Sequence, residues 1–327
     1  MLLKLILIIV GIALVIWGAD RLTEGASSLA RGMRVPEIII GLTIVAAGTS
    51  APELFVSMVA AFKGTADLAV GNVIGSNIFN TMLIVGCSAL VAPMAVAKST
   101  VKKDIPFAVI AAMLLFMLCF DDMDSPHLWG NEISRSDGFI LLTGFLAFMI
   151  YTFNAAKKEG LMPTPEELDE NSELPKDYSK LWRNLSLIVL GLACLIIGSN
   201  LFVDAASYVA YRYGVRQSVV GLTIVAGGTS LPELATSVVA AYKGRSAIAI
   251  GNVIGSNVFN ILMILGVTAA VHPLRIMGIT IIDLMMMLVS IGLLWLFAFT
   301  KYFVSRREGF VLVAGFLAYM AWLLYLL

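Results

Sequence analysis

Long apolar stretches separated by short polar turns dominate the chain. The pattern predicts membrane-spanning segments at residues 3–20, 37–62, 67–92, 105–120, 137–155, 183–209, 217–242, 247–271, 277–299 and 307–326. A span takes about 20 apolar residues, and most of these segments are long enough. Helices are expected because a helix in lipid satisfies its own backbone hydrogen bonds. The pattern therefore predicts an all-α membrane protein with ten transmembrane helices.

One stretch departs from this pattern, at residues 156–182. It is rich in Lys, Glu, Asp and Pro, a composition typical of a solvated linker. It divides the chain into a first five-helix repeat at 1–155 and a second at 183–327. Five is an odd number, so the second repeat enters the membrane in the opposite orientation. Such inverted repeats are found in many secondary transporters, with the site near the midplane between them.

The two halves share a motif region. Residues 41–80 return as residues 221–260, and 28 of the 40 aligned pairs are identical. What repeats best is a carboxylate, hydroxyls, amides, glycines and a proline. A repeat kept only for packing would keep apolar residues instead. The repetition therefore predicts one polar site built from two halves.

Composition agrees with a membrane location and adds an orientation. The 327 residues are 59% hydrophobic and 13% charged, against roughly 25% charged in soluble domains. The formal net charge is zero, so nothing indicates a nucleic-acid partner, and the lipid bilayer is the expected surrounding. With both termini outside, 16 of the 22 Lys and Arg residues fall in inside loops. The positive-inside rule therefore predicts outside termini and a cytoplasmic linker.

Two prolines are expected to interrupt the second and seventh helices. Pro52 and Pro232 stand within their predicted segments, and an interior proline removes a backbone donor and clashes one turn back. We expect breaks at 46–49 and 226–229 that free backbone carbonyls at membrane depth. Such carbonyls are tolerated only where they face protein or water.

Polar residues beside these breaks share helix faces. Thr49, Ser50 and Glu53 lie on one face, and Asn72, Ser76 and Asn80, spaced by four, lie on another. The second copies are Thr229, Ser230, Glu233, Asn252, Ser256 and Asn260. All these donors are oxygens, without the His or Cys that zinc or copper prefers. Calcium takes six to eight oxygen ligands, and sodium accepts the same kind.

The two glutamates set the charge of this site. A carboxylate at the centre of a membrane costs about 2.5–3.5 kcal/mol on insertion scales, so Glu53 and Glu233 need a partner. Their two charges are balanced by one calcium ion, two sodium ions or two protons. Species that neutralise the same pair must compete, which is a physical basis for exchange.

At these residues the sequence resembles the cation/calcium exchanger superfamily, specifically its prokaryotic sodium/calcium exchanger-like branch. The matching motifs are Gly48-Thr49-Ser50-Ala51-Pro52-Glu53, Gly75-Ser76-Asn77-Ile78-Phe79-Asn80, Gly228-Thr229-Ser230-Leu231-Pro232-Glu233 and Gly255-Ser256-Asn257-Val258-Phe259-Asn260. The resemblance covers essentially the whole chain. It implies adjacent central sites for calcium and sodium, reached by sliding of the first and sixth helices over the other eight.

The resemblance also assigns roles by matching position. It places the bridging carboxylates at Glu53 and Glu233, calcium-site oxygens at Thr49 and Thr229, sodium-site oxygens at Ser50, Ser76, Ser230 and Ser256, carbonyl ligands at Ala46 and Ala226, and amides between the carboxylates at Asn80 and Asn260. Some prokaryotic members carry Asp where this chain has Asn260, so two core carboxylates are expected here. Interhelical hydrogen bonding is the interpretation for Asn72, Asn77, Asn252 and Asn257.

The hypothesis is therefore a secondary-active antiporter of a bacterial or archaeal cell membrane, working as a monomer without cofactors, that exchanges calcium for sodium by alternating access. A proton-coupled or potassium-dependent cation exchanger is the alternative. An ion channel would instead give flux that does not depend on a counter-ion. An intramembrane enzyme would need a nucleophile or metal triad beside the carboxylates, and none accompanies them, so the chain is not expected to be an enzyme.

Overall fold

The structure is a computed structural model that describes residues 1–33, 35–119, 132–158, 178–214, 226–276 and 279–326. The helical elements of the first half are α1 (Leu2–Gly32), α2 (Glu37–Ile40), η1 (Gly41–Val45), α3 (Ala46–Thr49), α4 (Ala51–Phe62), α5 (Ala66–Ile78), η2 (Phe79–Ile84), α6 (Val85–Val91), η3 (Thr100–Asp104), α7 (Ile105–Leu118) and α8 (Arg135–Lys158). Those of the second half are α10 (Tyr178–Arg212), α12 (Ala226–Thr229), α13 (Leu231–Tyr242), α14 (Ser246–Val258), η5 (Phe259–Ile264), α15 (Leu265–Val271), α16 (Ile281–Lys301) and α17 (Arg306–Leu326). Elements marked η are π-helical turns.

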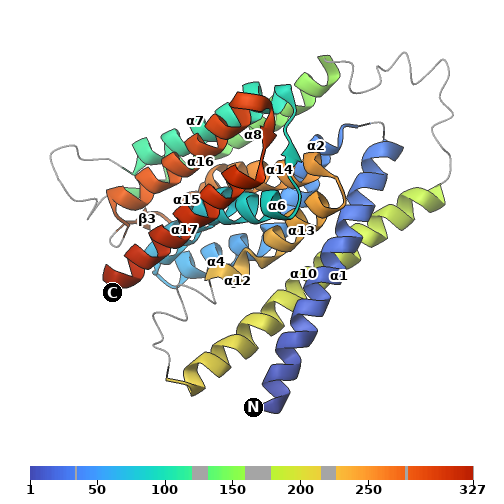
Figure 1. The fold of residues 1–327 in the computed structure, drawn as a ribbon. Helices are drawn as coiled ribbons and strands as arrows, with labels where there is room; N and C mark the ends of the chain where they lie inside the picture. The colour runs from blue at the N-terminus through green and yellow to red at the C-terminus, as the bar shows by residue number, and fades with distance from the viewer. Residues whose placement is uncertain (34, 120–131, 159–177, 215–225, 277–278, 327) are drawn as a thin grey trace, which may run out of the picture.

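The described residues form the predicted helical bundle (Figure 1). They include seven helices long and apolar enough to cross a membrane, or eight if the bent pair Glu37–Thr49 and Ala51–Phe62 is one span. The predicted span 105–120 appears as α7 preceded by η3. This segment is not among the seven, because η3 carries the charged residues Lys102, Lys103 and Asp104. The predicted span 217–242 begins outside the described residues and continues as α12 and α13. Most of the predicted linker 156–182 also lies outside them.

The first helix is longer than its apolar run indicated. The prediction ended it at residue 20, whereas α1 continues to Gly32. Arg21 pairs with Glu24 one turn away at 2.9 Å, so the charges beyond residue 20 are satisfied on the helix surface without unwinding it. The end of the apolar run therefore does not mark the end of this helix.

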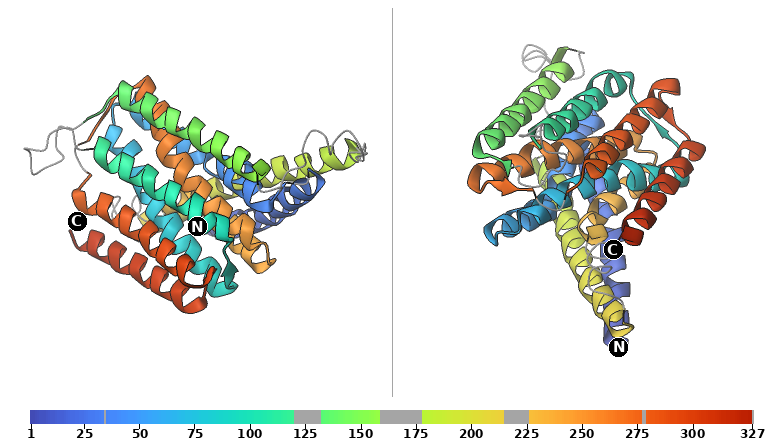
Figure 2. Two further views of the ribbon diagram at one scale, coloured as in Figure 1. Left: turned by 90° about the horizontal axis from the view of Figure 1, so that it is seen from above. Right: turned by 90° about the vertical axis from the view of Figure 1, so that its left-hand side faces the viewer.

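α1 and α10 form a pair that stands apart from the other helices (Figure 2). Glycines let the two backbones touch. A Cβ added at Gly18 would lie 2.7 Å from the carbonyl oxygen of Gly191, and one added at Gly191 would lie 2.8 Å from that of Gly18. Small residues at helix contacts in membranes permit this approach. The pair is thus joined through its own backbones along a continuous seam.

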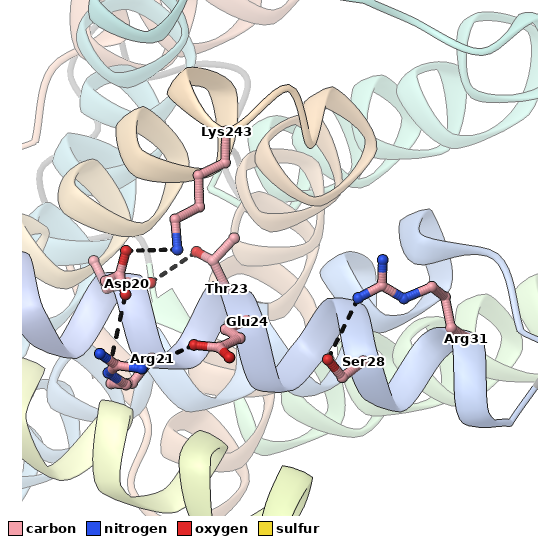
Figure 3. A network of polar contacts seen from close by, with 8 residues as sticks. Asp20, Arg21, Thr23, Glu24, Ser28, Arg31 and Lys243 are labelled. Atoms are coloured by element: carbon pink, nitrogen blue, oxygen red, sulfur yellow. Dashed lines mark hydrogen bonds and ion pairs between the residues drawn. The ribbon is translucent and has the colours of Figure 1, made fainter.

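The second half of α1 is also attached to the C-terminal end of α13 by an ion pair (Figure 3). The Lys243 ammonium, at the C-terminal end of α13, lies 2.5 Å from Asp20 Oδ1. Nearby, the Arg245 guanidinium lies 3.0 Å from Glu37 Oε1, and the Ser27 hydroxyl of α1 donates to the same carboxylate. These contacts hold α1 against the α13 end of the bundle.

Neutralising Asp20 should loosen this attachment. The Lys243–Asp20 pair is about one-third exposed, and such pairs contribute about 0.2–1 kcal/mol. We therefore expect Asp20→Asn to increase local opening by up to about fivefold. Hydrogen–deuterium exchange of the amides at 243–246 measures it. Glu24→Gln is the matched control, because it removes an ion pair that lies within α1 alone. Equal exchange in both variants would contradict the attachment.

Four two-residue strands were not expected from the sequence. β1 (Met94–Ala95) pairs antiparallel with β4 (Phe303–Val304), and β2 (Glu132–Ile133) pairs antiparallel with β3 (Leu274–Arg275). Each ladder joins a loop of the first half to a loop of the second. They satisfy loop backbone groups between helices and leave the helical class of the fold unchanged.

Candidate ion-binding site

Each half contains a helix break immediately before its glutamate. Ser50 and Ser230 leave helical geometry, with φ −82° and ψ 6° and with φ −89° and ψ 8° respectively. The two segments around Ser50 meet at 45°. Pro52 lies in the first turn of α4, where its missing N–H costs nothing. Each half is therefore interrupted, but the predicted position was wrong: residues 46–49 and 226–229 are helical, as α3 and α12, and the breaks lie at Ser50 and Ser230. The prediction that the prolines are interior was also wrong, because each lies in the first turn of a new helix.

The break changes which carbonyls are available. The Ala46 carbonyl accepts the Ser50 N–H at 3.0 Å, so it is not left wholly free, although a carbonyl oxygen has a second lone pair. The Gly48 carbonyl has no donor four residues on, because Pro52 lacks an N–H. Its counterpart at Gly228 accepts a hydrogen bond from the Ser199 hydroxyl. Ala226 begins α12, and its side chain lies outside the described part of the structure.

The two carboxylates are held crosswise by the opposite repeat. The Ser50 hydroxyl donates to Glu233 Oε1 at 2.9 Å, and the Ser230 hydroxyl donates to Glu53 Oε1 at 3.0 Å. The Ser230 oxygen also lies 3.2 Å from that of Ser76. Glu53 and Glu233 are 0% and 1% exposed. The site therefore exists only where the two repeats meet.

The threonines of the two motifs lie beside the same groups. The Thr49 hydroxyl donates to Asn252 Oδ1 at 3.1 Å, and the Thr49 side chain also interacts with the Glu233 carboxylate. Thr229 interacts with the Glu53 carboxylate. Thr49 is fully buried. Both threonines thus lie at the carboxylate of the opposite repeat, as their serine neighbours do.

Several buried oxygens in this region have no hydrogen-bond partner among the described residues. They are Glu53 Oε2, Glu233 Oε2, Asn80 Oδ1, Asn260 Oδ1 and Ser256 Oγ. A buried polar atom left without a partner is costly. Five such oxygens, two of them on carboxylates, form a set that cations would satisfy.

The chemistry of these atoms restricts the cation. No group of three or more His, Cys, Asp and Glu side chains lies together in the part of the chain that the structure describes. Transition metals prefer nitrogen and sulfur ligands. Carboxylate, hydroxyl and amide oxygens suit hard cations such as calcium. The site is therefore suited to hard cations.

The interhelical hydrogen bonds predicted for Asn72 and Asn252 are confirmed, whereas their serine partners Ser57 and Ser237 were not predicted. The Asn72 amide nitrogen lies 3.3 Å from the Glu53 carbonyl and 3.1 Å from Ser57 Oγ. In the other repeat the Asn252 amide nitrogen lies 3.4 Å from the Glu233 carbonyl and 3.0 Å from Ser237 Oγ. A signal was present in the sequence: Ser57 and Asn72 recur 180 residues later as Ser237 and Asn252.

A second feature absent from the prediction is the π-helical turn at each central amide. Asn80 lies in η2 and Asn260 in η5. A π turn inserts one extra residue and is frequent at functional sites. The Asn80 carbonyl accepts from the N–H of Val85, five residues on, so the extra residue lies after Asn80. The even four-residue spacing therefore does not continue beyond this amide.

A large cavity of the described structure lies away from these residues. It measures about 390 Å³ and is lined almost wholly by apolar residues, namely Met33, Val35, Ile39, Ile40, Leu42, Thr43, Ile44, Ala47, Phe145, Met149, Phe153 and Phe259. None of the predicted ligands lines it. Apolar walls cannot replace the hydration shell of an ion, so this cavity is not the ion site.

Comparison with known proteins places this geometry in a family. The sodium/calcium exchanger protein family matches residues 3–154 and again residues 184–325. The chain belongs to the sodium/calcium exchanger family. The two matches correspond to the two repeats, one in each half. As a member of this family the chain is a multi-pass membrane antiporter of the cation/calcium exchanger type and not an enzyme.

Relatives of this exchanger extend over its full length. It is 38% identical to the putative antiporter CaxA of Alkalimonas amylolytica, over 98% of each chain. It is 36% identical to the inner membrane protein YrbG of Escherichia coli K12, over 100% of this chain and 98% of YrbG. It is 31% identical to the sodium/calcium exchanger MaX1 of Methanosarcina acetivorans, over 98% of each. The match is therefore one of whole proteins.

The fold is likewise that of a solved exchanger. The structure superposes on the sodium–calcium exchanger NCX_Mj soaked with 10 mM sodium and no calcium, with a TM-score of 0.81, 28% identity and 98% coverage of each chain. This confirms the predicted all-helical fold of ten transmembrane helices in two inverted repeats. It also confirms the resemblance drawn from the two motifs.

Proposed function

We propose that this exchanger moves calcium against sodium across the membrane by alternating access. The observation that carries the proposal is the pair of buried carboxylates. In each, one oxygen accepts a hydrogen bond from a serine of the other repeat, and the second has no partner among the described residues. Their combined charge of two is matched by one calcium ion or by two sodium ions. Occupation by one species therefore excludes the other.

The proposal assigns a role to each group at the site. Glu53 and Glu233 bridge the central ions. Thr49 and Thr229 supply calcium-site oxygens, and the sodium-site oxygens come from Ser50, Ser76, Ser230 and Ser256 with the carbonyls of Ala46 and Ala226. Asn80 and Asn260 contribute amide oxygens between the carboxylates. The unpartnered oxygens of Asn80 and Ser256 support these assignments.

The surrounding architecture supplies the moving parts. α1 and α10 contact each other along a glycine seam and form one unit beside the remaining helices. We propose that this unit slides over the core, with the repeats at 1–155 and 183–327 as the two halves and both termini outside. The cage is completed by the two halves of a single chain, which supports function as a monomer.

The coupling ion is tested by calcium uptake into proteoliposomes. Sodium, proton and potassium gradients are imposed separately on the purified exchanger. We expect an outward sodium gradient alone to drive calcium uptake, because sodium and calcium compete for the same two carboxylates. Uptake that follows a pH gradient without sodium would replace the proposal by the proton-coupled alternative, and an absolute need for potassium would select the potassium-dependent one.

A further inference from the structure

The two central amides are equivalent in the repeat but are held differently. Asn80 and Asn260 lie 180 residues apart in corresponding π turns. The Asn80 amide nitrogen donates to Asn257 Oδ1 at 3.2 Å. Among the described residues neither amide atom of Asn260 has a hydrogen-bond partner. Pseudo-symmetry would give Asn260 the same bond to Asn77, so its absence needs a cause.

The two repeats differ at one position beside these amides. The Asn257 amide nitrogen donates to the Thr81 hydroxyl at 2.8 Å, and that hydroxyl donates to the Asn77 carbonyl at 2.8 Å. In the second repeat the counterpart of Thr81 is Ile261, which has no hydroxyl. The Asn77 amide nitrogen therefore donates to the Val73 carbonyl at 2.7 Å instead.

The chain of bonds through Thr81 decides the orientation of the Asn80 amide. An amide has a donor end and an acceptor end. Thr81 occupies the donor end of Asn257, which leaves Asn257 Oδ1 to receive the donor end of Asn80. The acceptor Asn80 Oδ1 is then the atom left over, buried and without a partner in the described structure. Asn80 is thus presented with its oxygen available to a cation.

We propose that Thr81 and Asn257 are positioning residues that fix the amide oxygen of Asn80 as a cation ligand, while Ile261 leaves the Asn260 amide able to present either end. The inference rests on the proposed ion site. One amide is then a fixed ligand. The other can offer its oxygen to a bound cation and its NH₂ group to a carboxylate when the cation leaves.

Removing the Thr81 hydroxyl tests the first half of the inference. Thr81→Val removes the acceptor of the Asn257 amide nitrogen, so this amide should turn to its own helix as Asn77 does. The Asn80 amide nitrogen then loses its bond to Asn257 Oδ1, a loss of about tenfold in calcium affinity. We expect the KM for calcium and the Kd for calcium in detergent to rise about tenfold. Thr81→Ser keeps the hydroxyl and should restore both values. Unchanged values in Thr81→Val would overturn the inference.

The matched control is Thr268→Val. Thr268 is buried and donates to the carbonyl four residues earlier, at Ile264, as Thr81 does to Asn77. Thr268→Val therefore measures the effect on calcium affinity of losing a threonine hydroxyl inside a helix. It does so without disturbing the hydrogen bond that Thr81 receives from Asn257 of the other repeat. We expect its calcium affinity to equal that of the wild type. A rise as large as that of Thr81→Val would show a general packing effect and overturn the inference.

A double-mutant cycle separates positioning from packing. If Thr81 acts through Asn80, then Thr81→Val should change calcium affinity little in an Asn80→Ala background, because the oriented oxygen is already gone. A tenfold effect in both backgrounds would show that Thr81 acts by another route. Wild-type protein measured alongside separates the two proposals: its failure to bind or exchange calcium would overturn the proposed function itself.

The reciprocal change tests the second half. Ile261→Thr supplies the missing hydroxyl, which would let the Asn77 amide turn and accept from Asn260. We expect the KM for calcium to fall about two- to fivefold and the maximal rate to fall with it, because a fixed amide cannot assist release. An unchanged KM and rate would show that Asn260 is not limited by its orientation.

Discussion

Replacing Glu53 or Glu233 by Gln is expected to stop calcium exchange almost completely. Either change removes half of the negative charge that balances the cargo, although it preserves the size of the side chain. A lost contact to a charged group costs about 1.5–3 kcal/mol, and in the proposed site each carboxylate bridges more than one ion, so we expect a fall on the order of 100-fold. Sodium-driven calcium uptake into proteoliposomes measures it.

The control for these variants is Glu132→Gln. Glu132 is partly exposed and pairs with Arg275 through the short β2–β3 ladder, away from the site. Its loss should leave uptake unchanged. Near-normal flux in both Glu53→Gln and Glu233→Gln would exclude the carboxylate pair as the cargo site. Loss in only one would show that the two repeats do not share the charge as their crossed serine contacts indicate.

Replacing Gly18 by Ala is expected to separate α1 from α10. The new methyl group would lie 2.7 Å from the Gly191 carbonyl oxygen and 2.9 Å from the Leu195 nitrogen. Both are backbone atoms that cannot turn aside, so the helices must move apart. Overpacking of this kind costs about 1–3 kcal/mol. We expect a lower unfolding temperature in detergent and a loss of most calcium exchange, because the paired helices no longer move together.

Gly292→Ala is the matched control for the seam. Gly292 also lies within a long apolar helix, α16, but a Cβ there meets nothing within 4 Å. Alanine also favours a helix more than glycine does, so this variant should be as stable as the wild type or more so. If Gly18→Ala exchanged calcium at the wild-type rate, the close backbone contact would not be needed for transport.

Much of the fold could be predicted from the spacing of apolar and polar residues along the sequence. Helices in lipid must satisfy their own backbone, so the apolar runs determined their number and approximate position. The copying of Glu53 as Glu233, together with an odd number of helices in each half, determined an inverted repeat. The same motif identified the ligand classes. These properties depend on composition and spacing along the chain, which a sequence states directly.

The partners within the site were decided by the tertiary structure. Ser50 binds Glu233 rather than its neighbour Glu53, and no spacing within one repeat contains that information. Helix ends also depended on tertiary structure. The helix α4 begins at Ala51, with Pro52 in its first turn, because the chain turns at Ser50. The helix α1 extends past its apolar run, and this extension buries Leu22, Ala26 and Leu29. Such outcomes depend on which groups meet across space.

The central amides of Asn80 and Asn260 show most clearly what the sequence determined and what only the tertiary structure decided. The sequence shows that Asn80 has its counterpart in Asn260, and that the residue equivalent to Thr81 in the second repeat is Ile261. Only the packed structure showed that Thr81 directs Asn257, and through it Asn80, while Asn260 is left without a partner among the described residues. Hydrogen bonds are short-ranged and directional, so their assignment requires atoms in place. Spacing along a chain determines which groups are available, and their arrangement in space determines which of them bond.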